Sequence, residues 1–232
     1  MGLIRAIIFD LDDTLWDCAP VIVRAEHAVF DFLQRRYPRV TEMHGLDSMR
    51  AARVRIAREH PSMRHDFTWL RLESLRIHAR EAGYPESMAQ EAFEVFYAAR
   101  NEVTLYEDVR PALDRLAQRD YRLFAISNGN ASLRAIGLDG YFEATLSARE
   151  AGMLKPDPRI FDILLQGAGL APAEAAHVGD DQEADVEGAR GAGVLPVWLN
   201  RAGVAWERDS PAPRHTIATL DPLPAILHGD RA

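Results

Sequence analysis

The chain has 232 residues, of which 47% are hydrophobic and 27% charged, which is enough for a buried core and a second, smaller unit. Its net charge of -8 argues against a nucleic-acid surface, and no apolar run approaches the roughly 18 residues of a membrane span. The single cysteine, Cys18, excludes an internal disulfide and a thiolate zinc cluster. Because the first residues lead straight into a strand-like run, we expect no signal peptide and a cytoplasmic protein.

Short apolar, β-branched runs recur along the chain and predict strands. They cover residues 4–9, 121–127, 144–147, 175–179, 194–199 and 215–218. Helices are expected between them: Asp108 and Pro111 introduce residues 112–119, and Asp157 and Pro158 introduce residues 159–168. Strands that alternate with helices predict an α/β fold with a doubly wound, Rossmann-like parallel sheet.

Residues 18–104 interrupt this alternation because their apolar positions repeat only at helical spacing. Helices are predicted around residues 21–33, 49–59, 67–82 and 86–103. The stretch 17–104 contains as many arginines as acidic residues, so the whole net charge of -8 falls on the remainder. We therefore expect a catalytic core of residues 1–16 and 105–232, with an inserted helical cap of residues 17–104.

Polar residues follow the predicted strands at their carboxyl ends, which is where open parallel sheets bind ligands. They are Asp10, Asp12, Asp13 and Thr14 after the first strand, Ser127 and Asn128 after the second, and Asp180, Asp181 and Asp185 after the fourth. Lys155 follows the third strand and is the only lysine of the chain. Each of these motifs alone could also have a purely structural role. The aspartates could form turns or cap helices, Ser127 and Asn128 could form a turn, and Lys155 could be a solvated side chain.

Together these residues predict a metal site. Like charges about 4 Å apart repel by roughly 4 kcal/mol at an effective dielectric of 20, so one lysine cannot compensate for so many carboxylates. A set of carboxylates without imidazole or thiolate favours a hard cation. If the site keeps positions open for water and phosphate oxygens, Mg²⁺ is favoured over Ca²⁺.

The ordered motifs resemble those of the haloacid dehalogenase-like hydrolase superfamily. They are Asp10-x-Asp12-x-Thr14, Ser127-Asn128-Gly129, Lys155-Pro156, and Gly179-Asp180-Asp181 followed by Asp185. The resemblance covers nearly the whole chain, since a helical insert directly after the first motif is what this superfamily calls a C1 cap. It implies an enzyme, a phosphoric monoester hydrolase, acting on a small phosphorylated metabolite.

The resemblance also implies roles for individual residues. Asp10 is the expected nucleophile, forming an aspartyl-phosphate, and Asp12 the general acid and base. Asp10 and Asp180 are expected to bind Mg²⁺ through their carboxylates and Asp12 through its backbone carbonyl. Lys155 is expected between nucleophile and phosphate, where a compact ammonium suits the gap better than a planar guanidinium. Ser127, Asn128 and Thr14 are expected to bind or support the phosphate, and Asp181 and Asp185 to hold metal waters or orient Lys155.

The substrate is predicted less sharply. The segments Phe9–Asp17 with Pro20-Val21-Ile22, and Ser127–Ala131, are similar to a bacterial subgroup that dephosphorylates flavin mononucleotide and a pyrimidine phosphate of riboflavin synthesis. Alternative substrates are a nucleoside monophosphate and phosphoglycolate, and an alternative reaction is that of a phosphomutase. Asp12 and the pair Asp180 and Asp181 disfavour a haloacid dehalogenase. The absence of a cap lysine disfavours a phosphonate-cleaving relative. The presence of both Asp10 and Asp12 disfavours an inactive binding module. The oligomeric state is not predicted.

Arginines and aromatic residues are frequent in the expected cap, and their ordinary roles as solvated and core side chains are favoured over substrate binding. The arginines are Arg50, Arg53, Arg55, Arg58, Arg64, Arg71, Arg76 and Arg80, and the aromatic residues Phe67, Trp69, Phe93, Phe96 and Tyr97.

Overall fold

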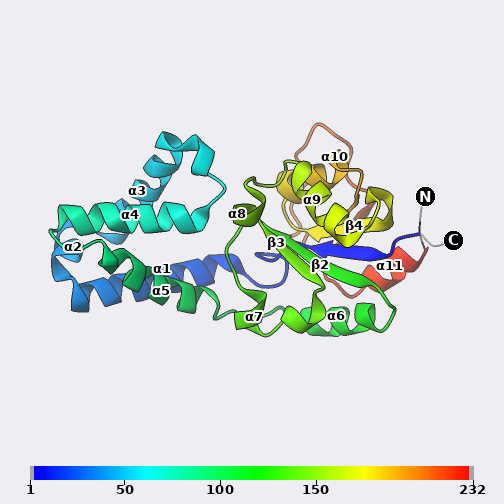
Figure 1. Cartoon of the computed structure of the whole chain (residues 1–232). Helices are drawn as coiled ribbons and strands as arrows, with labels where there is room; N and C mark the ends of the chain where they lie inside the picture. The colour runs from blue at the N-terminus through cyan, green and yellow to red at the C-terminus, as the bar shows by residue number, and fades with distance from the viewer. Residues whose placement is uncertain (1–2, 230–232) are drawn as a thin grey trace. The chain divides into compact units, whose positions relative to one another are not determined.

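The structure, a computed structural model, describes residues 3–229 (Figure 1). Met1, Gly2 and residues 230–232, with which the expected catalytic core begins and ends, lie outside the described residues. The chain divides into two compact units. The first comprises Met1–Asp17, Thr104–Gly129 and Gly137–Ala232, and the second Cys18–Val103 and Asn130–Ile136. Within the described residues, no helix has both the length and the apolar character needed to cross a membrane.

The first unit is built on a six-stranded sheet in the order β3-β2-β1-β4-β5-β6, with every neighbouring pair parallel. The strands are β1 (Ala6–Phe9), β2 (Arg122–Ser127), β3 (Ala144–Ser147), β4 (Ala175–Gly179), β5 (Leu195–Leu199) and β6 (His215–Ile217). β1 and β4 are buried along their whole length, which explains why they read as continuous apolar runs without alternation. The predicted α/β fold with its doubly wound sheet is confirmed.

Helices cover both faces of this sheet: α9 and α10 lie on one side, and α6 and α11 on the other (Figure 1). The helices of the unit are α6 (Val109–Ala117), α8 (Ala148–Ala151), α9 (Arg159–Ala168), α10 (Gly188–Gly191) and α11 (Leu223–Gly229). It also contains the 3₁₀ turns η2 (Asp139–Tyr141) and η3 (Pro172–Glu174) and the π-helix η4 (Gln182–Glu187). On the α9 side, Phe161 and Leu165 pack with Ile8 and Phe124 of the sheet. Helix α9 is therefore amphipathic because one face must fill this core.

The two expected helix starts behave differently. Asp157 Oδ1 accepts a hydrogen bond from the Arg159 N–H at 3.1 Å at the start of α9, where Pro158 occupies the N-cap position. Asp108, in contrast, makes no side-chain cap to α6. Its carboxylate accepts hydrogen bonds from the Arg201 guanidinium at 3.0 Å and from the Leu220 N–H at 2.6 Å. Asp108 therefore stands at the N-cap position of α6, as expected, but its side chain ties together distant segments of the chain instead of capping the helix.

The second unit is helical, as the periodicity predicts. It contains α1 (Cys18–Arg36), α2 (Pro38–Met43), α3 (Leu46–Glu59), α4 (Phe67–Glu81), α5 (Ser87–Arg100) and α7 (Leu133–Ile136), with the turn η1 (Pro61–Met63). Helices α1 and α5 pack side by side around Val29, Leu33 and Phe96 (Figure 1). Pro38 ends α1 but also begins α2, since its fixed φ suits a first helical turn.

Candidate active site

The ammonium of Lys155 lies at the centre of the candidate site and is 3% exposed. Its Nζ donates to Asp10 Oδ1 and to Asp185 Oδ1, both at 2.6 Å, and to the Ile126 carbonyl at 3.0 Å. These three acceptors use all three donors of the ammonium. Asp10 follows β1 and Ile126 lies in β2, so the lysine connects the carboxyl ends of neighbouring strands.

Asn128 fixes the backbone of the segment that carries this lysine. Its Oδ1 accepts from the Lys155 N–H at 2.8 Å, and its Nδ2 donates to the Lys155 carbonyl at 3.1 Å. Both ends of the side-chain amide are thereby engaged. The expected phosphate contact of Asn128 remains a prediction, and on this geometry it would come from the main chain.

Asp180 follows β4 and is fixed by two further residues. Thr14 Oγ1 donates to Asp180 Oδ1 at 3.1 Å, and Trp198 Nε1 donates to the Asp180 carbonyl at 2.8 Å. Thr14, fully buried, was expected beside the phosphate. Its hydroxyl hydrogen is instead directed at Asp180, so in this structure Thr14 positions a carboxylate.

Asp185 and Asp181, whose roles the sequence leaves undivided, occupy different places. Asp185 Oδ1 accepts from Lys155, and its Oδ2 accepts from the Asp181 N–H at 3.0 Å. The Asp181 side chain caps η4 by accepting from the Glu183 and Ala184 N–H groups at 2.8 and 2.6 Å. Asp185 therefore orients the lysine, while Asp181 shapes the turn that brings Asp185 into the site.

The remaining expected residues line the same edge of the sheet. Ser127, the last residue of β2, accepts a hydrogen bond from the Gly129 N–H at 2.9 Å through Oγ, which leaves its hydroxyl hydrogen to donate. Asp12 Oδ1 accepts from Trp16 Nε1 at 2.9 Å, which fixes the direction of the expected acid and base. The first unit thus brings all nine sequence-predicted site residues onto four neighbouring segments.

Three carboxylates lie close to a single ammonium, and their pKa values reflect this deficit of positive charge. Burial raises the pKa of Asp10 well above its ordinary value; Lys155 opposes the rise, and Asp185 and Asp180 add to it. Burial and the charge of Asp185 also raise the pKa of Asp180 to about 7. Burial opposes ionisation of Asp185, yet Lys155 and His177 hold its pKa below the ordinary value. The site as built has excess negative charge.

Carboxylate oxygens of Asp10, Asp180 and Asp185 lie within 4.8 Å of one another. Oxygen donors with excess negative charge suit a hard divalent cation, so Asp10 and Asp180 fit the expected metal, with Asp185 beside them. The side chain of Asp12 is not among these donors, in keeping with its expected contact through the backbone carbonyl.

The sequence indicates neither a role for His177 nor the reason for the motif glycine Gly179. His177 lies buried in β4, where its Nε2 is 2.9 Å from Asp185 Oδ1, and burial lowers its pKa. Because an ionised carboxylate only accepts, the neutral ring donates through Nε2–H. Gly179 is required by space, since a Cβ there would lie 2.2 Å from Asp185 Cγ. A polar residue inside an otherwise apolar strand is the signal that could have identified His177.

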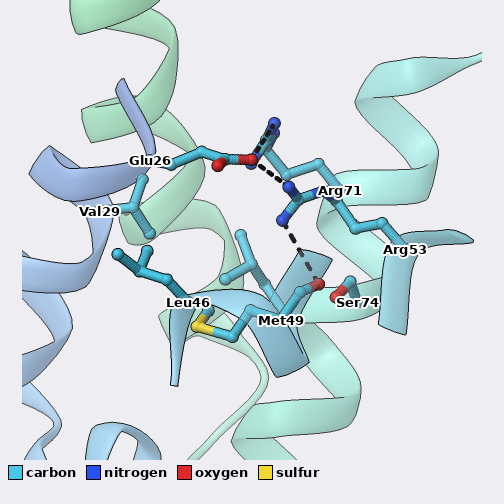
Figure 2. Close-up of a pocket in the computed structure, with 8 residues that line it drawn as sticks. Glu26, Val29, Leu46, Met49, Arg53, Arg71 and Ser74 are labelled. Atoms are coloured by element: carbon cyan, nitrogen blue, oxygen red, sulfur yellow. Dashed lines mark hydrogen bonds and ion pairs between the residues drawn. The ribbon is translucent and has the colours of Figure 1, made fainter. Parts of the chain in front are cut away.

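The second unit has a buried charge cluster of its own (Figure 2). Glu26 of α1, 6% exposed, forms an ion pair with Arg53 of α3 and lies 3.8 Å from Arg71 of α4. It also forms an ion pair with Arg50 of α3. Arg71 also stacks on Phe96, 3.4 Å from its ring centroid, and burial lowers its pKa to about 9. A cavity of about 20 Å³, room for about one water, adjoins Glu26, Arg53 and Arg71. Arg53 and Arg71 are therefore not solvated, contrary to expectation, whereas the side chain of Arg50 is 42% exposed.

The cap aromatic residues divide between core and surface. Phe96 is buried in the hydrophobic core of the second unit, as the core interpretation predicts, and Phe93 packs against the same core. Phe67 and Tyr97 are exposed, by 45% and 36%. Phe93 and Tyr97 stack with ring centroids 5.8 Å apart.

Comparisons with known proteins agree with this geometry. The sequence pattern of the haloacid dehalogenase-like hydrolase family matches residues 4–193. The 5-amino-6-(5-phospho-D-ribitylamino)uracil phosphatase YigB of Escherichia coli is 33% identical over 206 residues, covering 86% of this chain and 84% of the relative. Human N-acylneuraminate-9-phosphatase is 29% identical, with 98% and 96% covered.

Among solved structures, a 2-haloacid dehalogenase from Pseudomonas syringae is 38% identical with a TM-score of 0.92, covering 98% of this chain and 99% of that one. A phosphatase of the same family from Thermococcus onnurineus is 26% identical with a TM-score of 0.71, covering 99% and 100%. The family pattern spans most of the sequence, and its motifs meet in one site. The chain belongs to the haloacid dehalogenase-like hydrolase family.

Proposed function

We propose that the protein is a Mg²⁺-dependent phosphatase that hydrolyses a small phosphorylated metabolite through an aspartyl-phosphate intermediate. The observation that carries this proposal is the contact of Lys155 Nζ with Asp10 and Asp185, with Asp180 beside them. The ammonium holds one carboxylate oxygen of Asp10 in a fixed direction. Such a carboxylate is prepared to attack an electrophile rather than to form a mobile surface ion pair.

Asp10 and Asp180, with the backbone carbonyl of Asp12, are the residues that would hold Mg²⁺. When bound, the ion supplies positive charge that compensates for the carboxylates and the incoming phosphate dianion. Because Asp185 is already engaged by Lys155 and His177, we place it outside the direct ligand set.

In the proposed reaction, residues of the chain carry out two chemical steps. A carboxylate oxygen of Asp10 attacks phosphorus, the ester P–O bond breaks, and Asp12 gives its proton to the leaving alkoxide. In the second step Asp12 removes a proton from water, whose oxygen attacks the phosphorus of the aspartyl-phosphate. Inorganic phosphate leaves and the Asp10 carboxylate is restored. Ser127 Oγ donates to a phosphate oxygen, and Lys155 limits the negative charge between nucleophile and phosphate.

A 2-haloacid dehalogenase is the second candidate, favoured by the solved structure at 38% identity. Such an enzyme would bind a monoanionic carboxylate substrate. The three carboxylates around one ammonium argue against an anion entering this site unless a divalent cation enters too. A phosphate ester meets this condition because its oxygens can share the cation.

For the substrate we favour the pyrimidine phosphate intermediate of riboflavin synthesis, or flavin mononucleotide. The relative at 33% identity is a phosphatase named for 5-amino-6-(5-phospho-D-ribitylamino)uracil, which supports the motif resemblance. N-Acylneuraminate 9-phosphate is a competing substrate suggested by the human relative. Nucleoside monophosphates and phosphoglycolate also compete as substrates, and a phosphomutase reaction would use the same core residues.

The experiment measures phosphate release from a panel of phosphorylated metabolites and chloride release from 2-chloropropionate, each with Mg²⁺ and with EDTA. We expect Mg²⁺-dependent phosphate release, preferring the pyrimidine ribityl phosphate, no chloride release, and loss of activity in Asp10→Asn. Metal-independent chloride release would overturn the phosphatase proposal. An equal rate on all phosphate esters would overturn only the choice of substrate.

A further inference from the structure

Two histidines and a glutamate of the second unit gather around one carboxylate oxygen. His78 and Glu81 are three residues apart on α4 and so share a helix face, and His44 directly follows α2. Glu81 Oε2 lies 3.0 Å from His44 Nε2 and 3.5 Å from His78 Nδ1. The three ligand atoms all lie within 4.8 Å of one another.

The two ring nitrogens that face Glu81 are buried and share one carboxylate oxygen. Both lie within ion-pair distance of Glu81 Oε2, and neither forms a well-aligned hydrogen bond among the residues that the structure describes. The rings lie with centroids 4.3 Å apart and planes tilted by 41°. Two buried imidazole nitrogens that converge on one carboxylate oxygen provide three ligand atoms for a metal ion.

The distances fit a tetrahedral metal ion. Bonds of about 2.0–2.1 Å to nitrogen and oxygen imply ligand atoms about 3.3 Å apart in a tetrahedron. The two distances to Glu81 Oε2, 3.0 and 3.5 Å, lie on either side of this value. Ser74 Oγ lies 3.4 Å from His78 Nε2. If it accepts the Nε2 proton, the Nδ1 lone pair is left for a metal, which is the usual arrangement behind a ligating imidazole.

We propose that His44, His78 and Glu81 form a binding site for Zn²⁺, with a water as the fourth ligand. Two imidazoles and one carboxylate select a borderline transition metal, in contrast to the all-carboxylate cluster of the first unit, which suits Mg²⁺. The Glu81 side chain is 45% exposed, so the ion has a path from solvent. A bound ion would fasten the end of α2 to α4. This proposal does not depend on the proposed phosphatase function.

The test uses Co²⁺, whose visible absorption reports tetrahedral coordination, as the probe. Because the carboxylates of the first unit could also bind Co²⁺, the full chain carries Asp180→Asn in every sample and Mg²⁺ is present in excess. We expect one equivalent of Co²⁺ to bind with the absorption of a tetrahedral nitrogen and oxygen site, and Zn²⁺ to displace it. Removing the metal with EDTA should abolish the absorption.

Two added substitutions and one matched control locate the site. His44→Ala and Glu81→Gln, at side chains that are 18% and 45% exposed, should each abolish the Co²⁺ absorption without unfolding the chain. His27→Ala, an exposed histidine on α1, should leave it unchanged. If the absorption and stoichiometry are the same in all three derivatives, or if no Co²⁺ binds to the parent, the proposal is wrong.

Thermal unfolding provides a second readout. With Zn²⁺ at a hundredfold excess over its Kd, the midpoint of a protein of this size should rise by roughly 5–10 °C. The rise should be lost in His44→Ala and kept in His27→Ala. An equal rise in both would show that Zn²⁺ binds elsewhere and would overturn the proposal.

Discussion

Lys155 satisfies three acceptors at once, and this geometry predicts that no other cation can replace it. In Lys155→Arg the planar guanidinium must keep contacts with Asp10, Asp185 and the Ile126 carbonyl from a buried position built for a compact ammonium. We expect kcat for phosphate release to fall at least about 100-fold, comparable to the loss of one preorganised donor in other enzymes. Steady-state kinetics with Mg²⁺ measures the effect.

The matched control is Arg159→Lys, four residues further along. Arg159 is exposed and paired only with Asp157 in the described residues, so its exchange should change kcat little. Activity of Lys155→Arg close to that of the wild type would mean that the ammonium has no special role in this site.

A methyl group at residue 179 should disturb the site through Asp185. The Cβ of Gly179→Ala would lie 2.2 Å from Asp185 Cγ, which forces the carboxylate away from Lys155 and His177. We expect a loss of about 1–3 kcal/mol in the free energy of unfolding, typical of overpacking, together with lower kcat. Gly140→Ala, with no atom within 4 Å of the added Cβ, should leave both unchanged in denaturant unfolding and kinetic assays.

These residues also show what could be predicted from the sequence. Asp10 and Asp180 are recognisable in the sequence because each directly follows an apolar strand. Lys155 is recognisable because it is the only lysine of the chain. His177 is not recognisable, and Gly179 is recognisable only as a member of the motif. The space around a Cα and the partner of a buried ring depend on which segments meet. The same holds for Thr14, whose partner Asp180 lies 166 residues away.

At the scale of elements, β3 and β4 match the predicted residue ranges, and β1, β2, β5 and β6 differ by one or two residues at their ends. Burial on both faces makes such strands conspicuous as short apolar runs. The side-chain contacts at helix starts are less predictable, as Asp108 at the N-cap position of α6 shows. A carboxylate before a helix reads as a cap, yet Asp108 pairs with Arg201, which is 93 residues away. Long-range ion pairs of this kind leave no local signal.

The helices of the second unit depend on a buried charge that can be tested. Glu26→Gln would leave Arg53 and Arg71, which are 20% and 12% exposed, without their carboxylate partner. Removing one partner of a buried ion pair leaves an uncompensated charge, so we expect the free energy of unfolding to fall by about 3 kcal/mol. Denaturant unfolding of the full chain measures the change.

The control for this substitution is Glu59→Gln on α3. Glu59 and its partner Arg55 are both more than half exposed, and exposed pairs contribute little. Equal, small losses in the two variants would mean that Glu26 and its arginines do not stabilise α1 against α3 and α4.

At the scale of the whole molecule, the net charge of -8 and the carboxylate cluster make stability depend on pH and metal together. Burial and Asp185 raise the pKa of Asp180 from 3.8 to about 7 in the folded, metal-free protein. The folded state therefore holds this proton more tightly than the unfolded chain. The contribution of Asp180 to stability is favourable below about pH 4 and is lost as pH rises through about 7.

The comparison with Asp180→Asn isolates this effect, because contributions from His177 and other groups are common to both proteins. In EDTA, the variant should melt at a similar temperature to the wild type below about pH 4 and several degrees higher near about pH 8, where folding of the wild type must bury the charge or take up a proton. In excess Mg²⁺ the order near about pH 8 should reverse, since the ion binds the wild-type carboxylates and stabilises the folded state. A difference independent of pH in EDTA would mean that Asp180 is already ionised in the metal-free protein.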